Sequence, residues 1–485
     1  MNLKEDLANV VGADKFSDSA EDLAAYSRDH SLTKGCRPAC IVKPRNTGQV
    51  QKIVKLARES LTPVIPCSSR VHFYGSAVPK LGGIMVDLAG MNKILDIDEL
   101  NRKVRIEPGV TWSQMKKELE PKNLRLITPL LPHADSSVLT SAIERQVPVI
   151  STYEYSEPLG GAELVWPNGD IFRTGSASAP GYPDSASKGA NFEGPGINFI
   201  QLLKGAQGTM GIVTWTNVKV EYLPTVNKSF FSSFNDLAKA IRPMCRIQRL
   251  KIGQECFIIN RLNLASMLAE GKEEEFARLK SVLPPWILAL VISGLRRRPE
   301  EKVEYEENAL MTMKRSEFPE MKISTSLSGV PGAGSKLQKL LREPWPIEET
   351  YWKHFYKGGC EDLFFITRPS KVPGFFKIVE EAAMKNGFSP GDLGCYVQPI
   401  EYARACHMEF NFYYEPDNRK VADKIKRAKM EAARLLLDEG AFFTRPYGEL
   451  AKLVYEKAAT YTSVLKKVKT MFDPDNIMNP GNLCF

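Results

Sequence analysis

The first 225 residues alternate short strand and helix patterns, and this alternation limits the possible folds more than any other feature. Thr62-Pro63-Val64-Ile65-Pro66 reads as a buried strand that ends in a loop, and residues 103–109 alternate apolar and polar side chains with the period of a strand. The Asn168-Gly169 turn lies between two apolar runs and predicts a β-hairpin. Hairpins favour mixed or antiparallel pairing over a doubly wound parallel sheet, so we predict an α+β fold.

A different pattern begins near residue 226, where longer helical stretches alternate with a few strands. Strands are predicted at 286–293, 362–367 and 407–414. This pattern is typical of helices packed on an antiparallel sheet, and a chain of 485 residues is long enough for two or three domains. We therefore predict a first domain over 1–225, a second over 226–445, and a C-terminal segment, 446–485, that returns to the first.

The charge of the chain excludes some partners. Its 65 basic and 57 acidic residues leave a net charge of +8, and the basic residues are dispersed. The densest cluster, Arg296-Arg297-Arg298, is too small for a nucleic-acid site, so we predict no nucleic-acid partner. The longest apolar stretch, Trp286 to Ile292, is far shorter than the roughly 20 residues that cross a bilayer, so no membrane span is expected.

The N-terminus and the cysteines indicate the compartment. Acidic residues stand at positions 5 and 6, where a signal peptide would be apolar. The nine cysteines are scattered, with no Cys-x-x-Cys pair, which argues against a disulfide framework and against a zinc or iron–sulfur site. We expect reduced thiols, a cytoplasmic protein and no metal.

Four ordered groups of motifs run along the chain. They are Tyr74-Gly75-Ser76 with Glu107-Pro108-Gly109; Ala142-Ile143-Glu144-Arg145 with Trp166-Pro167-Asn168-Gly169 and Arg173-Thr174-Gly175; residues 208–214; and Asp473-Pro474 with Asn479-Pro480-Gly481. In order and spacing they resemble the FAD-linked oxidase superfamily. The second group is most similar to the vanillyl-alcohol oxidase and para-cresol methylhydroxylase (PCMH) family, and the resemblance covers nearly the whole chain.

This resemblance implies a two-lobed, PCMH-type FAD-binding domain, 1–225 with 446–485, around a substrate-binding cap. It implies FAD as the cofactor and hydride transfer to flavin N5 from a small aromatic substrate, a para-substituted phenol or an aryl alcohol. Two alternatives stay open: a D-2-hydroxy-acid dehydrogenase of the lactate or glycolate type, and a flavin electron-transfer subunit of a larger complex. We also expect a homo-oligomer and consider a redox partner, either a cytochrome or an electron-transfer flavoprotein.

Two stretches are candidates for binding the cofactor's diphosphate, which needs backbone N–H groups and close approach. The first contains Pro66, Ser68, Ser69, Arg70, Val71, His72, Gly75 and Ser76. Relatives usually have two or three glycines there, so serine hydroxyls and Arg70 would replace the missing backbone contacts. The second contains Gly208, Gly211, Ile212 and Val213, and further cofactor contacts are expected from Gly160 and Asn479. An ordinary polar loop and simple turn geometry are the structural alternatives.

Three residues are candidates for the chemistry. Arg445 lies among aromatic residues and is hard to bury without an anion, which suits charge stabilisation near the flavin. By resemblance, Tyr74 matches a tyrosine that binds a phenolate oxygen; Thr444 replaces its partner tyrosine, which weakens the case for a phenol. Glu154 matches the family's acid/base aspartate, and Glu157 competes with it for that role. A buried carboxylate of raised pKa suits such a role.

One histidine is a candidate for covalent attachment. His407 falls where covalent-flavin members of the family bind the flavin 8α-methyl group, and Cys406 and His72 are weaker candidates. A satisfied core histidine is the structural alternative. Ile400 replaces a metal-binding histidine of the related hydroxy-acid dehydrogenases, whose Asp-Gly-Asn motif is absent, which again predicts no metal site.

Overall fold

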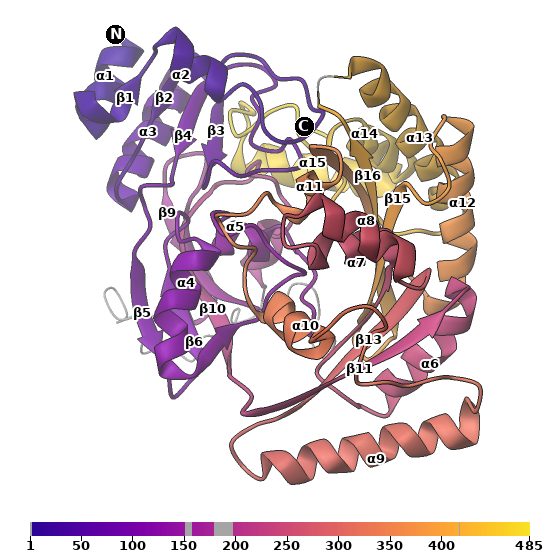
Figure 1. The fold of residues 1–485 in the computed structure, drawn as a ribbon. Coiled ribbons are helices and arrows are strands. Elements are labelled where there is room, and N and C mark those ends of the chain that lie inside the picture. The colour runs from indigo at the N-terminus through magenta and orange to yellow at the C-terminus, as the bar shows by residue number, and fades with distance from the viewer. Residues whose placement is uncertain (1, 151–157, 179–196, 417) are drawn as a thin grey trace.

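The structure is a computed structural model that describes residues 2–150, 158–178, 197–416 and 418–485. Three sheets and their helices form two parts that lie side by side, and the C-terminal segment returns to the first part (Figure 1). The predicted α+β fold is confirmed. The division into domains at residues 225 and 445 stays a prediction, although β10 (Ile212–Tyr222) ends and β11 (Val226–Phe234) begins at that first boundary.

The first sheet contains the predicted strand before the diphosphate loop. Its order is β1 (Phe16–Ser17), β2 (Cys40–Val42), β4 (Ile84–Asp87) and β3 (Val64–Cys67). β2, β4 and β3 are parallel, and β1 is antiparallel to β2. The helices beside it are α1 (Leu3–Val11), α2 (Ala20–Ala25) and α3 (Thr47–Glu59). Asn46 caps α3 by accepting from the Gln49 N–H, and one apolar stripe of that helix faces the sheet.

The second sheet is antiparallel. It runs in the order β5 (Ile94–Asp98), β6 (Lys103–Ile106), β10, β8 (Leu159–Val165) and β9 (Ile171–Arg173), and β7 (Leu124–Leu126) also pairs with β10. The Asn168-Gly169 hairpin is confirmed, because Val165 pairs with Ile171 and Gly169 takes the positive φ of +84° that the turn needs. Two helices accompany this sheet, α4 (Trp112–Leu119) and α5 (Val138–Ile143).

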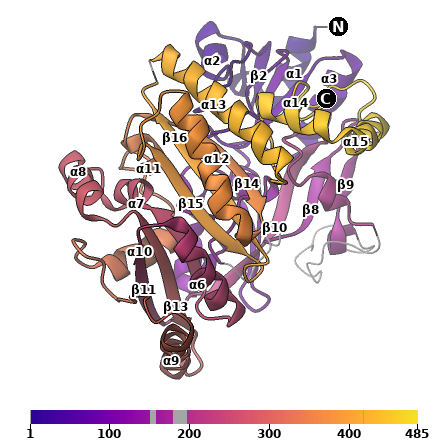
Figure 2. The same cartoon turned by 90° about the vertical axis from the view of Figure 1, so that its right-hand side faces the viewer.

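The third sheet forms the core of the second part. Its order is β11, β13 (Trp286–Gly294), β12 (Glu255–Asn260), β15 (Leu393–Ile400), β16 (Ala405–Tyr414) and β14 (Gly359–Thr367), and every pair is antiparallel. Strands β13, β14 and β16 confirm the three predicted from sequence. One face packs on α6 (Leu237–Arg249), α9 (Pro299–Glu317), α12 (Val372–Lys385) and α13 (Arg419–Asp438) (Figure 2). The other packs on α7 (Arg261–Leu268), α8 (Glu273–Val282), α10 (Ala333–Arg342) and α11 (Trp352–Phe355).

The C-terminal segment joins the two parts. After α14 (Gly448–Lys457) and α15 (Ala459–Phe472), the chain reaches β3, where Val64 and Met478 form a parallel bridge. The buried Asp473 carboxylate accepts from the backbone of Ile477 at 3.0 Å and from Lys469 Nζ at 2.5 Å, which fixes the turn. The turns at the end of the chain therefore build part of the first domain's core.

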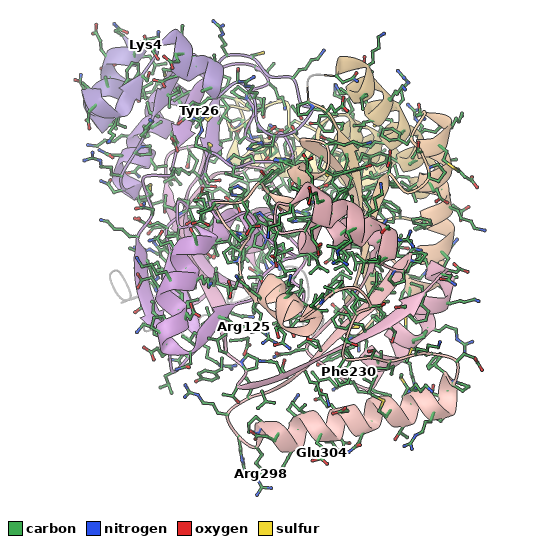
Figure 3. All side chains as sticks on the ribbon, viewed as in Figure 1. Lys4, Tyr26, Arg125, Phe230, Arg298 and Glu304 are labelled. Carbon is green, nitrogen blue, oxygen red and sulfur yellow. The ribbon has the colours of Figure 1, made fainter. Side chains whose placement is uncertain are left out.

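A buried ion cluster connects the two parts across their junction. Arg125 of β7 lies 2.7 Å from the Glu255 carboxylate of β12, and Arg342 of α10 lies 3.1 Å from it. Figure 3 shows Arg125 between the two parts. Burial favours the neutral acid, but the two guanidinium groups outweigh it and hold the pKa of Glu255 below its usual value.

We expect Glu255→Ala to lower the free energy of unfolding by about 3–5 kcal/mol, because it leaves two buried guanidinium groups without a carboxylate. Urea unfolding followed by circular dichroism measures this. The control is Glu317→Ala, which removes an exposed ion pair with Arg246 and should change stability by about 1 kcal/mol or less. Equal losses in the two variants would contradict the importance of the cluster.

Candidate functional site

Two hollows meet at the junction of the two parts. The central hollow encloses about 950 Å³ of empty space, open solvent included, and is bounded by residues of the loop 69–76, of α5 and of the third sheet. The side hollow encloses about 660 Å³, again with open solvent, and runs between the stretch 66–77 and residues 203–213. His72, Ser76, Thr140 and Glu144 line both. The two hollows therefore adjoin along these four residues.

The two predicted diphosphate stretches lie against each other. A Cβ atom on Gly208, which has φ of +72°, would lie 2.6 Å from Pro66 Cγ. The Asn479 side-chain amide donates to the carbonyls of Ser76 at 2.8 Å and Gln207 at 2.6 Å, so the C-terminal segment joins both stretches. The close approach of Pro66 leaves no room for a side chain at position 208, so a glycine there lets the two stretches pack together.

Most of the predicted cofactor residues face these hollows. Pro66, Ser68, His72, Ser76, Gly208, Gly211, Ile212 and Val213 line the side hollow. Ser69, Val71, His72, Tyr74, Ser76, His407 and Arg445 line the central hollow. The roles of these residues stay predictions, but the structure brings them together.

Four predicted residues lie elsewhere. The Arg70 guanidinium stacks on the Tyr26 ring at 3.7 Å and lines neither hollow. Gly75 shapes the loop through φ of +77° and donates its N–H to Asp29, and Gly160 is buried in β8. Asn479 acts as the tie described above. Glu154 and its competitor Glu157 lie outside the described residues.

Arg445 is a buried cation without an anion. Its side chain lies over the Phe364 ring at 4.2 Å and 5.7 Å from the Tyr74 ring centroid, and the residue is only 4% exposed. Nη1 has no hydrogen-bond partner, and no carboxylate of the described residues lies within ion-pair distance. Because a buried charge is costly unless it is paired, this guanidinium fits an anionic group that a cofactor or substrate brings.

An aromatic wall surrounds Arg445. Tyr74 stacks on Tyr447 at 5.0 Å with an interplanar angle of 18°, and the edge of Phe364 meets Tyr74 at 5.4 Å. The Tyr447 hydroxyl donates to Glu144 at 3.0 Å, which also accepts from the backbone of residue 207. Burial raises the pKa of Glu144, although Tyr447 and Arg445 oppose this effect. Sequence reasoning missed Tyr447 and Glu144 as site residues, although Glu144 lies in a quoted motif and Tyr447 is two residues from Arg445.

A second charged cluster lies behind His407. Lys353 Nζ is 2.5 Å from Asp362 and 2.6 Å from Glu409, and His407 Nε2 is 3.5 Å from Glu409. Burial opposes the charged forms of Lys353 and Glu409. The mutual attraction is stronger and raises the pKa of Lys353 while it lowers that of Glu409. Burial lowers the pKa of His407 despite its carboxylate neighbour, so the imidazole is neutral at pH 7.

Strand alternation separates His407 from Cys406. His407 of β16 faces the central hollow, whereas the Cys406 thiol is buried in the apolar core on the opposite face of the sheet. His72 also lines the hollow, and its Nε2 is 3.3 Å from the Cys67 thiol. These placements leave the two histidines beside the hollow and Cys406 away from it.

All five histidines of the chain gather at this site, which the sequence did not reveal. His72, His133 and His407 line the central hollow, and the rings of His30 and His354 lie 5.3 and 5.7 Å from Phe73, which also lines it. Burial lowers the pKa of His354 to about 4. Across the described ranges, no group of three or more histidine, cysteine or acidic residues is placed to bind a metal ion.

Comparisons with known proteins agree with this geometry. Residues 38–175 match the FAD binding domain family. The glycolate oxidase subunit GlcD of Bacillus subtilis is 30% identical over 52% of this chain and 51% of its own length. The 4-cresol dehydrogenase (hydroxylating) flavoprotein subunit of Pseudomonas putida is 30% identical over 57% of this chain and 53% of its own. The chain thus matches about half the length of these two relatives.

Two further likenesses cover almost the entire chain. D-2-hydroxyglutarate dehydrogenase of Stutzerimonas stutzeri is 24% identical over 99% of this chain and 98% of its own length. A crystal structure of p-cresol methylhydroxylase with substrate bound covers 100% of this chain and 96% of that one, with a TM-score of 0.84 and 19% identity. At that identity the structural likeness shows the fold.

The match to the FAD binding domain family and the flavoprotein relatives show an FAD-dependent oxidoreductase, and FAD is its cofactor. The chain carries this FAD binding domain over residues 38–175 and has the fold of p-cresol methylhydroxylase. The residues present fit this cofactor, because both predicted diphosphate stretches line one hollow and the buried Arg445 guanidinium lacks an anion among the described residues. Within the described residues, every helix is too short or too polar to pass through a lipid bilayer.

We expect Gly208→Ala to weaken FAD binding about tenfold or more, because the new methyl group collides with Pro66 in the cradle. FAD titration of the apoprotein by fluorescence measures the dissociation constant. Gly332→Ala is the matched control, since Gly332 has a similar φ of +66° but open space around it. Unchanged FAD affinity in Gly208→Ala would contradict the position of the cradle.

Proposed function

We propose that the protein oxidises a small aromatic substrate, a para-substituted phenol or an aryl alcohol, by hydride transfer to flavin N5. The unpartnered Arg445 guanidinium beside Tyr74 carries this proposal, because it offers a buried anion site in the wall of the central hollow. The relative named for 4-cresol and the shared fold support it.

The bound flavin supplies the hydride acceptor, and the chain's own residues do the rest. Arg445 stabilises negative charge on the substrate or near the flavin N1 and C2 carbonyl, where a fixed donor in a buried site acts strongly. Tyr74 holds the polar end of the substrate. The raised pKa of Glu144 keeps its carboxyl closer to neutral, and its bond to Tyr447 fixes the aromatic wall. We assign the acid/base role to Glu154, as the family resemblance implies.

A second candidate function is the oxidation of D-2-hydroxy acids. The relatives named for glycolate and D-2-hydroxyglutarate favour it, and Arg445 can bind a carboxylate as readily as a phenolate. Thr444 in place of the family's second tyrosine also favours it. A third reading, electron transfer within a larger complex, fits a relative named as a flavoprotein subunit. For each of these functions we also propose a cytochrome or an electron-transfer flavoprotein as a possible electron acceptor, self-association of the chain and a cytoplasmic location.

Anaerobic bleaching of the bound flavin distinguishes these functions. We expect 4-alkylphenols to bleach it and D-lactate and glycolate to leave it oxidised. Arg445→Met should slow flavin reduction by about 10²- to 10³-fold, as the loss of one preorganised charge donor does in other active sites. Stopped-flow absorbance measures the rate. Arg445→Lys keeps the charge without the planar fork and should recover part of it. Bleaching by D-lactate alone would favour the second candidate.

Covalent attachment is tested by acid precipitation of the holoenzyme. We expect the yellow colour to remain in the pellet for the wild type and to move to the supernatant for His407→Ala, because the neutral imidazole faces the central hollow. Cys406→Ala and His72→Ala serve as controls and should keep the colour in the pellet. A yellow supernatant from the wild type would show that FAD is not covalently bound.

A further inference from the structure

A third hollow lies behind the aromatic wall. It encloses about 2060 Å³ of empty space, open solvent included, and is lined by residues of β14, α13, α14 and α15, of the C-terminal turns and of the first 80 residues. These helices run together along one side of the molecule (Figure 2). Tyr74, Arg445 and Tyr447 line this hollow and the central hollow alike. We call it the lysine chamber, and only the wall separates it from the proposed reaction site.

The chamber carries an excess of positive charge. Its cationic lining, apart from Arg445, is Lys34, Lys80, Lys426, Lys429, Lys452 and Lys466. Lys429 pairs with Glu361 at 2.6 Å, and Lys80 Nζ donates to the Gly75 carbonyl, where burial lowers the pKa of Lys80 to about 8. The other four have no carboxylate of the described residues within ion-pair distance.

The acidic residues of the lining do not cancel this charge. Glu361 already pairs with Lys429, and Asp362 pairs with Lys353. Glu449 and Glu456 are exposed on α14 and lie in no printed ion pair with the chamber's lysines. Four free lysines and the unpartnered Arg445 guanidinium therefore face a space that holds two uncompensated carboxylates.

Part of the remaining lining is apolar. Leu32, Leu363, Phe364, Met430, Leu450 and Leu483 belong to it. An apolar surface with a cationic rim binds a molecule that combines an apolar body with an anionic group. The concave shape suits a small molecule, since the faces that bind proteins are generally larger and flatter.

We propose that the lysine chamber is the substrate entrance and that the substrate is an amphiphilic anion. The oxidised carbon passes the wall first, and the anionic head follows and rests at Arg445 with the chamber lysines around it. This inference rests on the proposed function and narrows its substrate to molecules that carry an anionic group, a phenolate, carboxylate or phosphate, opposite the reacting carbon. The lysines also attract such molecules over several ångströms of screened solvent, which accelerates their capture.

Binding of matched aryl ligands to the yellow holoenzyme tests the inference. The probes are 4-butylbenzoate, its uncharged isostere 4-butylbenzamide, 4-butylphenyl phosphate and inorganic phosphate. Calorimetry and the shift of the flavin absorbance measure the dissociation constants. We expect the benzoate and the aryl phosphate to bind more tightly than the benzamide, with a difference that shrinks at high salt, and inorganic phosphate to bind weakly.

The variant pair isolates the chamber. Lys426→Ala with Lys466→Ala removes two lining cations and should weaken binding of the two aryl anions roughly three- to tenfold, as expected for two partly exposed ion pairs, with the benzamide unchanged. Lys420→Ala with Lys467→Ala is the control: it removes the same charge from the same two helices, α13 and α15, at exposed positions outside the chamber, and should leave all affinities unchanged.

Several outcomes would overturn the inference. Equal affinity for 4-butylbenzoate and 4-butylbenzamide would show that the chamber has no anion site. Equal losses of aryl-anion affinity in the two double variants would show that the effect comes from net charge. If inorganic phosphate bound as tightly as the aryl phosphate, the apolar body would contribute nothing to binding and the ligand would not need to be amphiphilic. FAD content is measured in every sample: protein without FAD refutes the proposed function, whereas FAD-loaded protein with any of these results refutes only the entrance.

Discussion

The buried guanidinium of Arg445 is the constraint on which the rest of this site depends. A folded chain does not usually retain a 4% exposed cation that no carboxylate of the described residues neutralises, because desolvation of an isolated charge is costly. Two other cations of the same interior, Arg125 and Lys353, both have carboxylates at 2.5–2.7 Å. The difference indicates that position 445 is arranged for an anion from outside the chain.

The C-terminal segment explains how such a site is held in place. Arg445 follows α13 of the cap, and thirty-odd residues later Asn479 joins the carbonyls of residues 76 and 207 in the first domain. The chain between them forms α14 and α15 and one side of the lysine chamber. The wall residue Tyr447 is likewise bonded to Glu144 of the first domain. Hydrogen bonds from the C-terminal segment thus fix the position of Arg445 relative to the first domain.

Local patterns predicted much of this arrangement. The strand Val64–Cys67, the Asn168-Gly169 hairpin and the three cap strands follow from period-two alternation and turn chemistry, which act over a few residues. Arg445 was recognisable because a cation among aromatic residues needs an explanation. The cluster of Lys353, Asp362 and Glu409 was not, because only the pairing of β14 with β16 and the approach of α11 bring those side chains together. Arg70 fitted the expected chemistry of the loop, but its side chain turns to Tyr26, a choice that depends on packing with α2.

The charged groups on the two sides of the reaction site differ in how they are paired. On the cap side, Lys353, Asp362 and Glu409 satisfy one another, so the cluster holds a fixed charge that a passing ligand alters little. Burial, with a smaller contribution from the cations Arg445 and Lys353, outweighs Glu409 and lowers the pKa of His407, which favours the neutral ring. On the wall side, Arg445 has no carboxylate partner among the described residues, so its guanidinium is available to bind an anionic ligand. The charges on the cap side are paired, whereas the charge of Arg445 is not. A polar molecule is therefore oriented with its negative end toward Arg445, because only that side stabilises added negative charge. The lysine chamber lies on the same side as Arg445, and its lysines extend the positive charge toward solvent.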